Sequence, residues 1–291
     1  MSTKSSLTLE LLQKIITSPK KLNMFRYFSL IEMSILLIAG GGKFGKKALD
    51  YGKKNDYKTI LIDNNPNCFC AEYATQKFET VNDFYSKMEK IKPGQVFLLI
   101  HDISIIYELI IKINPEYVIP VIPIHLSAQI IEKFMDEKTQ INLAPDKDST
   151  KKFINNISED LFLTHNLEEG VAYLSYAKID EICPDNCFGP KDFCPNFKRN
   201  KPITITDYFK TYYKLDNNFR IIKNGTTRII IIFESYQLTS GLGGLKGEDL
   251  KITLDELNNN LDLITSQNFN LVIATTCNCH GVVNFYRNFT N

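Results

Sequence analysis

Residues 40–45 read G-G-G-K-F-G and have the spacing of a phosphate-binding turn, G-x-G-x-x-G. Each glycine has a physical role in such a turn. Gly40 permits the tight turn, Gly42 lets the backbone approach a pyrophosphate, and Gly45 allows a helix to pack closely on a strand. The helix that follows offers unpaired N–H groups and its positive dipole end to the phosphate. The run therefore predicts a dinucleotide site.

Asp63 supplies the second half of this pattern. It closes the next apolar segment at the expected distance, about 20 residues beyond the first glycine. Its carboxylate would accept hydrogen bonds from ribose hydroxyls and repel a 2′-phosphate, which favours NAD over NADP. A glycine-rich turn without nucleotide is one alternative. A P-loop is another, but Lys47 stands where a P-loop has Ser or Thr.

Three cysteines in a short proline-containing segment form a second candidate site. Cys183 and Cys194 are each followed by proline, and Cys187 lies between them in the pattern C-P-x-x-C-x6-C-P. Proline directly after a ligating cysteine is found in ferredoxin-type iron–sulfur motifs. Three local ligands require a fourth, which we expect from a second cysteine-rich turn at Cys277, Cys279 and His280.

We expect this metal centre to be an iron–sulfur cluster of the [4Fe–4S] type, with four thiolates or with three and one open iron. Zinc is the alternative, because it accepts four cysteines or three cysteines and a histidine. Reduced cysteines in a rigid loop without metal are the third reading. Cys68 and Cys70 follow Asp63, and we expect them to serve packing rather than metal binding.

Acid–base candidates occur at the ends of predicted strands. His101 and His125 each follow an apolar strand, at the sheet edge where open α/β folds bind ligands. A histidine there can move protons beside a nicotinamide, although a packing role is the alternative for each. Glu234 ends a later strand and is, together with His101, a predicted catalytic residue, with an ordinary strand-end carboxylate as the alternative. The glycine-rich segment 240–247 is expected to be a loop, either near a ligand or as a surface lid.

Strands and helices alternate through the first half of the chain. Strands are predicted at 34–39, 58–63, 95–100, 117–122 and 140–144, with a further one at 160–166. Helices are predicted at 43–54, 82–91, 103–113, 126–136 and 148–157. Near-continuous apolar strands between helices indicate a parallel sheet that is covered on both faces.

The predicted fold class is therefore α/β, with a doubly wound, Rossmann-like dinucleotide-binding domain at 33–167. A second, smaller α/β cysteine-rich metal-binding domain is expected at 168–291, with a strand at 227–234, a helix at 253–266 and a strand at 269–275. Residues 1–32 are predicted to be a helical extension. Either it is an arm for self-association into a homo-oligomer, or Met33 is the native start.

Residues 38–45 and 60–66, I-A-G-G-G-K-F-G and I-L-I-D-N-N-P, resemble the NAD-binding domains of potassium-uptake regulators of the TrkA-N or RCK type. They also look like the N-terminal dehydrogenase module of siroheme synthases. The resemblance covers roughly the first half of the chain. It implies a Rossmann fold and NAD(H) or another adenine nucleotide, used as a substrate or as a sensed ligand.

The composition excludes several classes of function. Lys plus Arg number 34 and Asp plus Glu 33, so the net charge of +1 gives no reason to expect nucleic acid. The apolar runs are strand-sized, so no membrane span is expected. The N-terminal residues lack the apolar core of a signal peptide, which predicts a cytoplasmic protein. The seven cysteines are then not expected to form disulfides.

Together these patterns predict an NAD-linked redox protein with a cysteine-ligated metal centre. Its partners would be the dinucleotide and an unidentified small molecule or redox protein. One alternative is a non-catalytic NAD(H) sensor with a structural metal site. The other is a tetrapyrrole-pathway NAD-dependent dehydrogenase, which rests on the resemblance alone and would use His101 or His125.

Overall fold

The structure is a computed structural model that describes residues 34–288. The predicted helical extension at 1–32, and with it the choice between Met1 and Met33 as the start, lies outside the described residues.

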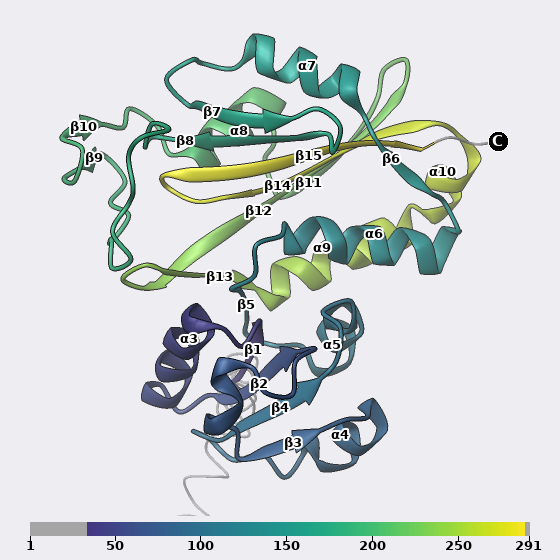
Figure 1. Cartoon of the computed structure of the whole chain (residues 1–291). Helices are drawn as coiled ribbons and strands as arrows, with labels where there is room; N and C mark the ends of the chain where they lie inside the picture. The colour runs from purple at the N-terminus through teal and green to yellow at the C-terminus, as the bar shows by residue number, and fades with distance from the viewer. Residues whose placement is uncertain (1–33, 289–291) are drawn as a thin grey trace, which may run out of the picture. The chain divides into compact units, whose positions relative to one another are not determined.

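The first part of the sheet is parallel, in the order β3-β4-β2-β1-β5 (Figure 1). These strands are β1 (Ile35–Ala39), β2 (Lys58–Asp63), β3 (Gln76–Phe78), β4 (Val96–Ile100) and β5 (Tyr117–Pro120). The connections contain α3 (Lys43–Lys54), the 3-10 helix η1 (Phe69–Tyr73), α4 (Val81–Met88) and α5 (Ile105–Ile113). The predicted elements of this part are confirmed to within a few residues. The sequence does not predict β3, because that strand has three residues and two of them are exposed.

The sheet continues beyond β5 in the order β13-β12-β14-β15-β8-β7, with β11 paired to β12 and β6 paired to β15. The strands are β6 (Leu143–Pro145), β7 (Phe162–Asn166), β8 (Val171–Ser175), β11 (Phe219–Lys223), β12 (Thr227–Thr239), β13 (Leu242–Lys246), β14 (Phe269–Thr276) and β15 (His280–Asn288). A separate two-stranded ribbon joins β9 (Phe193–Cys194) to β10 (Arg199–Asn200). The fold is thus mixed α/β around one large sheet.

Strand direction brings the predicted site residues to one edge of this sheet. β13 is antiparallel to both β5 and β12, so β12 runs in the direction of β5 and β1. β14 is in turn parallel to β12. The carboxyl ends of β1, β2, β4, β5, β12 and β14 therefore share one edge, which is where ligands bind in open α/β sheets.

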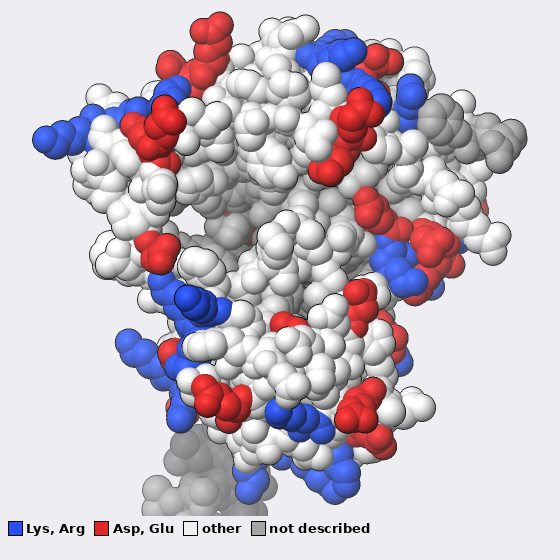
Figure 2. Space-filling view, in the orientation of Figure 1, with Lys and Arg blue, Asp and Glu red and all other residues white. Residues whose placement is uncertain are grey.

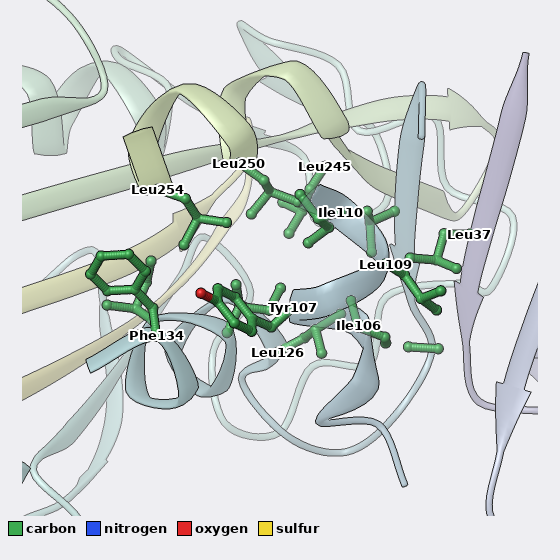
Figure 3. Packing of buried hydrophobic residues seen from close by; sticks show 14 of the residues in the cluster. Leu37, Ile106, Tyr107, Leu109, Ile110, Leu126, Phe134, Leu245, Leu250 and Leu254 are labelled. Atoms are coloured by element: carbon green, nitrogen blue, oxygen red, sulfur yellow. The ribbon is translucent and has the colours of Figure 1, made fainter. Parts of the chain in front are cut away.

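Helices pack on both faces of the sheet. One face carries a continuous core formed with α4, α5, α6 (Leu126–Thr139), α9 (Gly247–Asn259) and α10 (Leu261–Ser266). The other face has two smaller cores, one with α3 and η1 and one with α7 (Lys147–Asn156) and α8 (Ile205–Tyr213). Figure 3 shows that the continuous core joins both parts of the sheet, since Leu37 of β1 and Leu109 of α5 belong to the same cluster as Leu250 of α9.

Three features differ from the sequence-based expectation. Segment 240–247 is mostly strand β13 in a hairpin with β12, and only Gly241 at the turn has a left-handed backbone (φ 64°). The helix predicted at 253–266 is two helices, α9 and α10. Finally, β6 and β7 pair with β15 and β8, so they belong to the second part of the sheet, whereas we predicted a division at residue 167.

Charged side chains are distributed without a large area of one sign on the face in Figure 2, where Lys and Arg alternate with Asp and Glu around a largely uncharged centre. Among the described residues, no helix is both long enough and apolar enough to cross a bilayer.

The shared core makes a stability prediction with a matched pair on one helix. On α9, Leu250 is 0% exposed in the continuous core, whereas Ile252 is 52% exposed. We expect Leu250→Ala to lower the free energy of unfolding by about 2–5 kcal/mol, because it removes buried methyl groups and leaves a cavity. Ile252→Ala should change it by less than about 1 kcal/mol. Urea denaturation of both variants measures the difference, and equal losses would contradict the assigned core.

Candidate metal centre and nucleotide loop

The glycine loop follows β1 at the carboxyl edge of the sheet. Gly40 has φ of 107°, and a Cβ there would lie 2.9 Å from the carbonyl oxygen of Val121. A Cβ on Gly45 would lie 2.4 Å from the carbonyl oxygen of Gly40. These two positions therefore require glycine, one for the turn and one for the close approach of α3 to the turn.

The two middle glycines differ in their surroundings. A Cβ on Gly41 would meet the sulfur of Cys68 at 2.4 Å, so this glycine accommodates a neighbouring segment of the chain. A Cβ on Gly42 would have no atom of the described residues within 4 Å. Gly42 is also the N-cap of α3, which has no side-chain cap and no acidic residue in its first turn. The space beside Gly42 is thus open at the positive end of a helix.

Asp63 and the two cysteines that follow it hold this loop in place. The Asp63 Oδ2 accepts a hydrogen bond from the Gly41 N–H (2.7 Å), and Oδ1 accepts one from Asn65 (2.8 Å). Cys70 donates its N–H to the Gly41 carbonyl (2.8 Å) and its S–H to the Gly42 carbonyl (3.3 Å). Burial raises the pKa of the Cys70 thiol to about 11, which keeps this donor protonated.

All five cysteines of the predicted metal centre line one cavity of roughly 540 Å³. Cys183 and Cys187 lie in the segment between β8 and β9, and Cys194 ends β9. Cys277 and Cys279 belong to the turn between β14 and β15. The fold thereby brings two distant segments of the chain together, as the sequence predicts.

His280 lies between thiols from the two segments. Its Nε2 is 3.6 Å from the sulfur of Cys183, and its Nδ1 is 3.8 Å from that of Cys277. Desolvation by the surrounding protein, followed by the charge of Lys201, lowers the pKa of His280, whose side chain is still partly exposed to solvent. The imidazole is therefore neutral at physiological pH, which leaves one ring nitrogen with a free lone pair.

A buried lysine, which the sequence analysis does not single out, reaches the same cavity. Lys201 is 3% exposed, and its ammonium lies 3.0 Å from the sulfur of Cys279 and donates to the carbonyl of Pro190. Within residues 34–288, Lys201 forms no ion pair with a carboxylate. A buried ammonium needs a compensating negative charge, and the sulfur of Cys279 is the nearest group in this cavity that could carry one.

Backbone and amide N–H groups point at two of the sulfurs. The Cys277 sulfur accepts from the N–H groups of Cys279 (3.4 Å) and His280 (3.3 Å). The Cys187 sulfur accepts from the N–H of Gly189 (3.4 Å) and from the side-chain amide of Asn196 (3.5 Å). Such donors stabilise negative charge on sulfur and tune the potential of a bound cluster.

The thiols also influence one another. The pKa of Cys183 is raised by burial first, and then by the charges of the other four cysteines of the cavity, Cys187, Cys194, Cys279 and Cys277. Burial likewise raises the pKa of Cys277. In the part of the chain that the structure describes, no three His, Cys, Asp or Glu side chains are close enough to hold a single metal ion. The donors thus surround a space rather than a point.

The two predicted catalytic residues are not brought together. Glu234 lines the cysteine cavity and lies 4.0 Å from the ammonium of Lys210. His101 lies at the end of β4, where its Nδ1 is 2.9 Å from the Asp102 carbonyl, and it is not among the residues that line the cavity.

The cysteine segment contacts the helix of the glycine loop. The Lys47 ammonium on α3 donates to the carbonyl of Asp185 (2.6 Å), between Cys183 and Cys187. The N–H of Gly241, at the β12–β13 turn, donates to the carbonyl of Cys187 (2.8 Å). Figure 1 shows the chain between β8 and β9 descending past this turn towards α3. The two candidate sites are therefore neighbours.

His125 belongs to a different group of side chains. Its Nδ1 is 2.7 Å from the Asn284 Oδ1, and its Nε2 is 2.9 Å from the Thr275 hydroxyl and 2.8 Å from the Ser127 hydroxyl. His125 follows a strand, as predicted, but no local pattern identifies its partners, because Thr275 and Asn284 are more than a hundred residues away along the chain.

The fold and the site define a mixed α/β protein with a cysteine-lined cavity at the carboxyl edge of its sheet. The chain belongs to the AF_1314 family: residues 127–289 match its C-terminal domain and residues 35–126 its N-terminal domain, each described as a domain of an "Uncharacterized protein". The family thus divides the chain at 126, before β6, α7 and β7.

A protein of Archaeoglobus fulgidus, also described as "Uncharacterized protein", is 28% identical over 247 residues, which are 85% of this chain and 96% of the relative. No solved structure matches the chain significantly.

The burial of His125 predicts a pH dependence of stability. Burial lowers its pKa from 6.5 to about 4. As the pH falls below 6.5, His125 binds a proton in the unfolded chain but not in the folded protein, so the contribution of this histidine to stability decreases down to about pH 4 and then levels off. This loss should reach roughly 3 kcal/mol. We expect His125→Gln to remove it, whereas His165→Gln, on the exposed end of β7, should keep it.

Urea denaturation of the three proteins between pH 7.5 and pH 4 measures these slopes. Parallel slopes for the wild type and His125→Gln would contradict a buried, neutral His125.

Proposed function

We propose that this protein is an NAD-linked redox protein that holds an iron–sulfur cluster in the cysteine cavity. The observation that carries the proposal is the convergence of five cysteines, from two distant segments, on one cavity that also contains the buried ammonium of Lys201. Most of these five thiols are partly buried, and when they are ionised their negative charges repel one another. Packing alone does not offset this repulsion, whereas bound metal cations would.

The donor arrangement supports a cluster over a single zinc ion. Zinc draws four sulfurs to about 2.3 Å from one point. In a cluster, several irons and sulfides separate the ligating sulfurs, so the ligands stand farther apart. No three donor groups of the described chain share a point in the structure, while the five thiols surround a cavity of roughly 540 Å³. We assign the ligands to Cys183, Cys187, Cys194 and one of Cys277 or Cys279.

The protein would contribute charge and hydrogen bonds to this centre. A cluster ligated by thiolates is anionic, and Lys201 supplies a positive charge next to Cys279. The N–H donors at Cys187 and Cys277 would stabilise the same charge. A bound cluster supplies one-electron transfer, and the neighbouring Glu234 could bind or orient a small substrate in the remainder of the cavity.

The nucleotide half of the proposal is a Rossmann-like NAD site at the glycine loop. Parallel strands in the order β4-β2-β1-β5, the open backbone at Gly42 and the carboxylate of Asp63 support it. The contact of Lys47 with the cysteine segment would place the two cofactors on neighbouring elements.

A sensor with a structural metal site is the second candidate. It is favoured by the geometry of Asp63, both of whose carboxylate oxygens already bind backbone N–H groups, and by the separation of His101 from the cavity. In this case NAD(H) would bind and leave unchanged, and the Lys47 contact would transmit its occupancy to the cysteine segment.

The metal content separates these readings. Protein produced without oxygen should absorb broadly near roughly 400 nm and contain about four irons per chain. The double variant Cys183→Ser/Cys187→Ser should lose the absorption and the iron, because two assigned ligands are gone. Cys68→Ser is the matched control and should keep both, since Cys68 packs against the glycine loop.

Iron and sulfide analysis with visible spectroscopy measures the outcome. One zinc and no iron would favour the sensor, whereas protein without metal, or iron retained in the double variant, would overturn the cluster.

The nucleotide site has its own test at Gly42. We expect Gly42→Asp to weaken NADH binding about tenfold or more, because it places a negative charge where the pyrophosphate would lie. Gly42→Ala is the steric control and should fold normally, since nothing lies within 4 Å of its Cβ. Fluorescence titration with NADH measures affinity. Unchanged binding by a folded Gly42→Asp protein would contradict the site.

A further inference from the structure

A second cavity lies at the same sheet edge but holds none of the five cysteines. It has a volume of roughly 350 Å³ and is bounded by the β5–α6 connection, β14 and β15. Most of its lining is apolar, including Ile122, Leu126, Leu245 and Val282. Among residues 34–288, no Lys, Arg, Asp or Glu lines it. The polar groups in its wall are those of His125, Ser127 and Thr275, together with the phenol of Tyr173.

His125 is oriented so that one ring nitrogen can accept a hydroxyl proton. Its Nδ1 lies 2.7 Å from the Asn284 Oδ1, which only accepts hydrogen bonds, so Nδ1 carries the proton. Nε2 is then the acceptor, and it lies 2.8 Å from the Ser127 hydroxyl. Burial lowers the pKa of His125 to about 4, so the ring is neutral at physiological pH.

Two more side chains hold the hydrogen bonds of His125 in place, Thr275 next to Ser127 and Tyr286 next to Asn284. The Thr275 hydroxyl lies 2.7 Å from the Ser127 hydroxyl and can donate to it while Ser127 donates to the imidazole. Behind Asn284, the side chain of Tyr286 forms hydrogen bonds with both Asn284 and Glu132. The amide of Asn284 is thereby held in one orientation, and it in turn holds the ring.

Electrophilic assistance is available next to the Ser127 hydroxyl. Ser127 is the second residue of α6, a helix of 14 residues. At its start, the Gln129 N–H donates to the His125 carbonyl (3.2 Å). The N–H groups of Leu126, Ser127 and Ala128 precede that bond and have no acceptor within the helix. Such N–H groups stabilise a developing oxyanion.

We propose that Ser127, His125 and Asn284 form a nucleophile, base and orienting group in this cavity, and that they hydrolyse small, uncharged carboxylic esters. The geometry meets the requirements of that chemistry: a nucleophile bonded to a base, and the base bonded to a third group. The substrate class follows from the lining, which is apolar and without charge, and from the limited volume.

The reaction balances with water as the only co-reactant. The Ser127 oxygen attacks the ester carbonyl carbon while its proton passes to the His125 Nε2. The carbon–alkoxide bond then breaks, and the imidazolium returns the proton to the departing alcohol. Water next attacks the acyl-serine with His125 again as base, the acid leaves, and Ser127 regains its proton. Ester and water become acid and alcohol.

A short-chain alkyl fluorophosphonate tests the nucleophile directly in the full-length protein. We expect a single adduct by intact mass, and peptide mapping should place it on Ser127. This mapping needs no variant, so it is unaffected by any variant that fails to fold. An adduct on Thr275, on another residue or nowhere would overturn the proposal.

Variants test the roles of the other residues. His125→Gln and Asn284→Ala should each slow labelling and p-nitrophenyl acetate hydrolysis by at least about tenfold. Ser149→Ala is the matched control and should react like the wild type, because Ser149 lies in the first turn of α7 without a histidine partner. Thermal unfolding verifies that each variant is folded. Unchanged labelling by a folded His125→Gln protein would exclude His125 as the base.

The site is independent of the metal centre. Cys183→Ser/Cys187→Ser should be labelled at the wild-type rate, since neither cysteine lines this cavity. A proportional loss of labelling in that variant would instead tie the reaction to the cysteine cavity and overturn the assignment.

Discussion

One antiparallel strand determines the arrangement of the whole sheet. β13 pairs with β5 on one side and with β12 on the other, and it therefore makes the parallel strands of the two parts run in the same direction. The helix after it, α9, begins at Gly247, where a Cβ would lie 1.7 Å from the carbonyl oxygen of Pro115. Only glycine permits that approach, and the approach lets α9 pack beside α5 in the continuous core. Because the direction is shared, the carboxyl ends of these parallel strands meet at one edge, where the glycine loop follows β1 and the turn with Cys277 follows β14.

Charge is the second constraint at this edge. A buried ammonium such as Lys201 is unfavourable unless negative charge lies beside it, and a group of thiolates is unfavourable without positive charge. The ammonium and the thiolates therefore stabilise one another. We accordingly assign Lys201, which lies next to Cys279, to the cysteine site and not to the protein surface. Lys47 of α3, the helix that follows the glycine loop, contacts this site. Its partner is a backbone carbonyl, so the contact holds the cysteine segment in position rather than balancing a charge.

The sequence predicts the residues at strand ends well and their partners poorly. The strand that precedes Gly40, the glycine pattern and the apolar runs are local signals, and the elements they predict are present within a few residues. The convergence of Cys183 with Cys277 is also predicted, but only because cysteines are rare and proline marks their segment. Lys201, Ser127 and Asn284 carry no such mark, since lysine, serine and asparagine are common on surfaces. β13 shows the opposite failure: its glycines predict a loop, whereas in the sheet they allow side chains such as Ser235 and Leu238 of β12 to lie against the backbone.

The end of β14 explains how two separate sites can share one edge. Successive side chains of a strand point to opposite faces. Thr275 faces His125 and Ser127 on the side of α6, and Thr276 bonds to Thr206 of α8 (3.0 Å) on the other side, next in sequence to Cys277. The cysteine cavity and the cavity beside His125 thus share no lining residue among those that the structure describes. Both cavities are bordered by β13 as well as by the β14–β15 hairpin, since Leu242 and Gly243 line the cysteine cavity and Leu245 lines the other. The position of these strands is therefore a route by which a change at one site can reach the other.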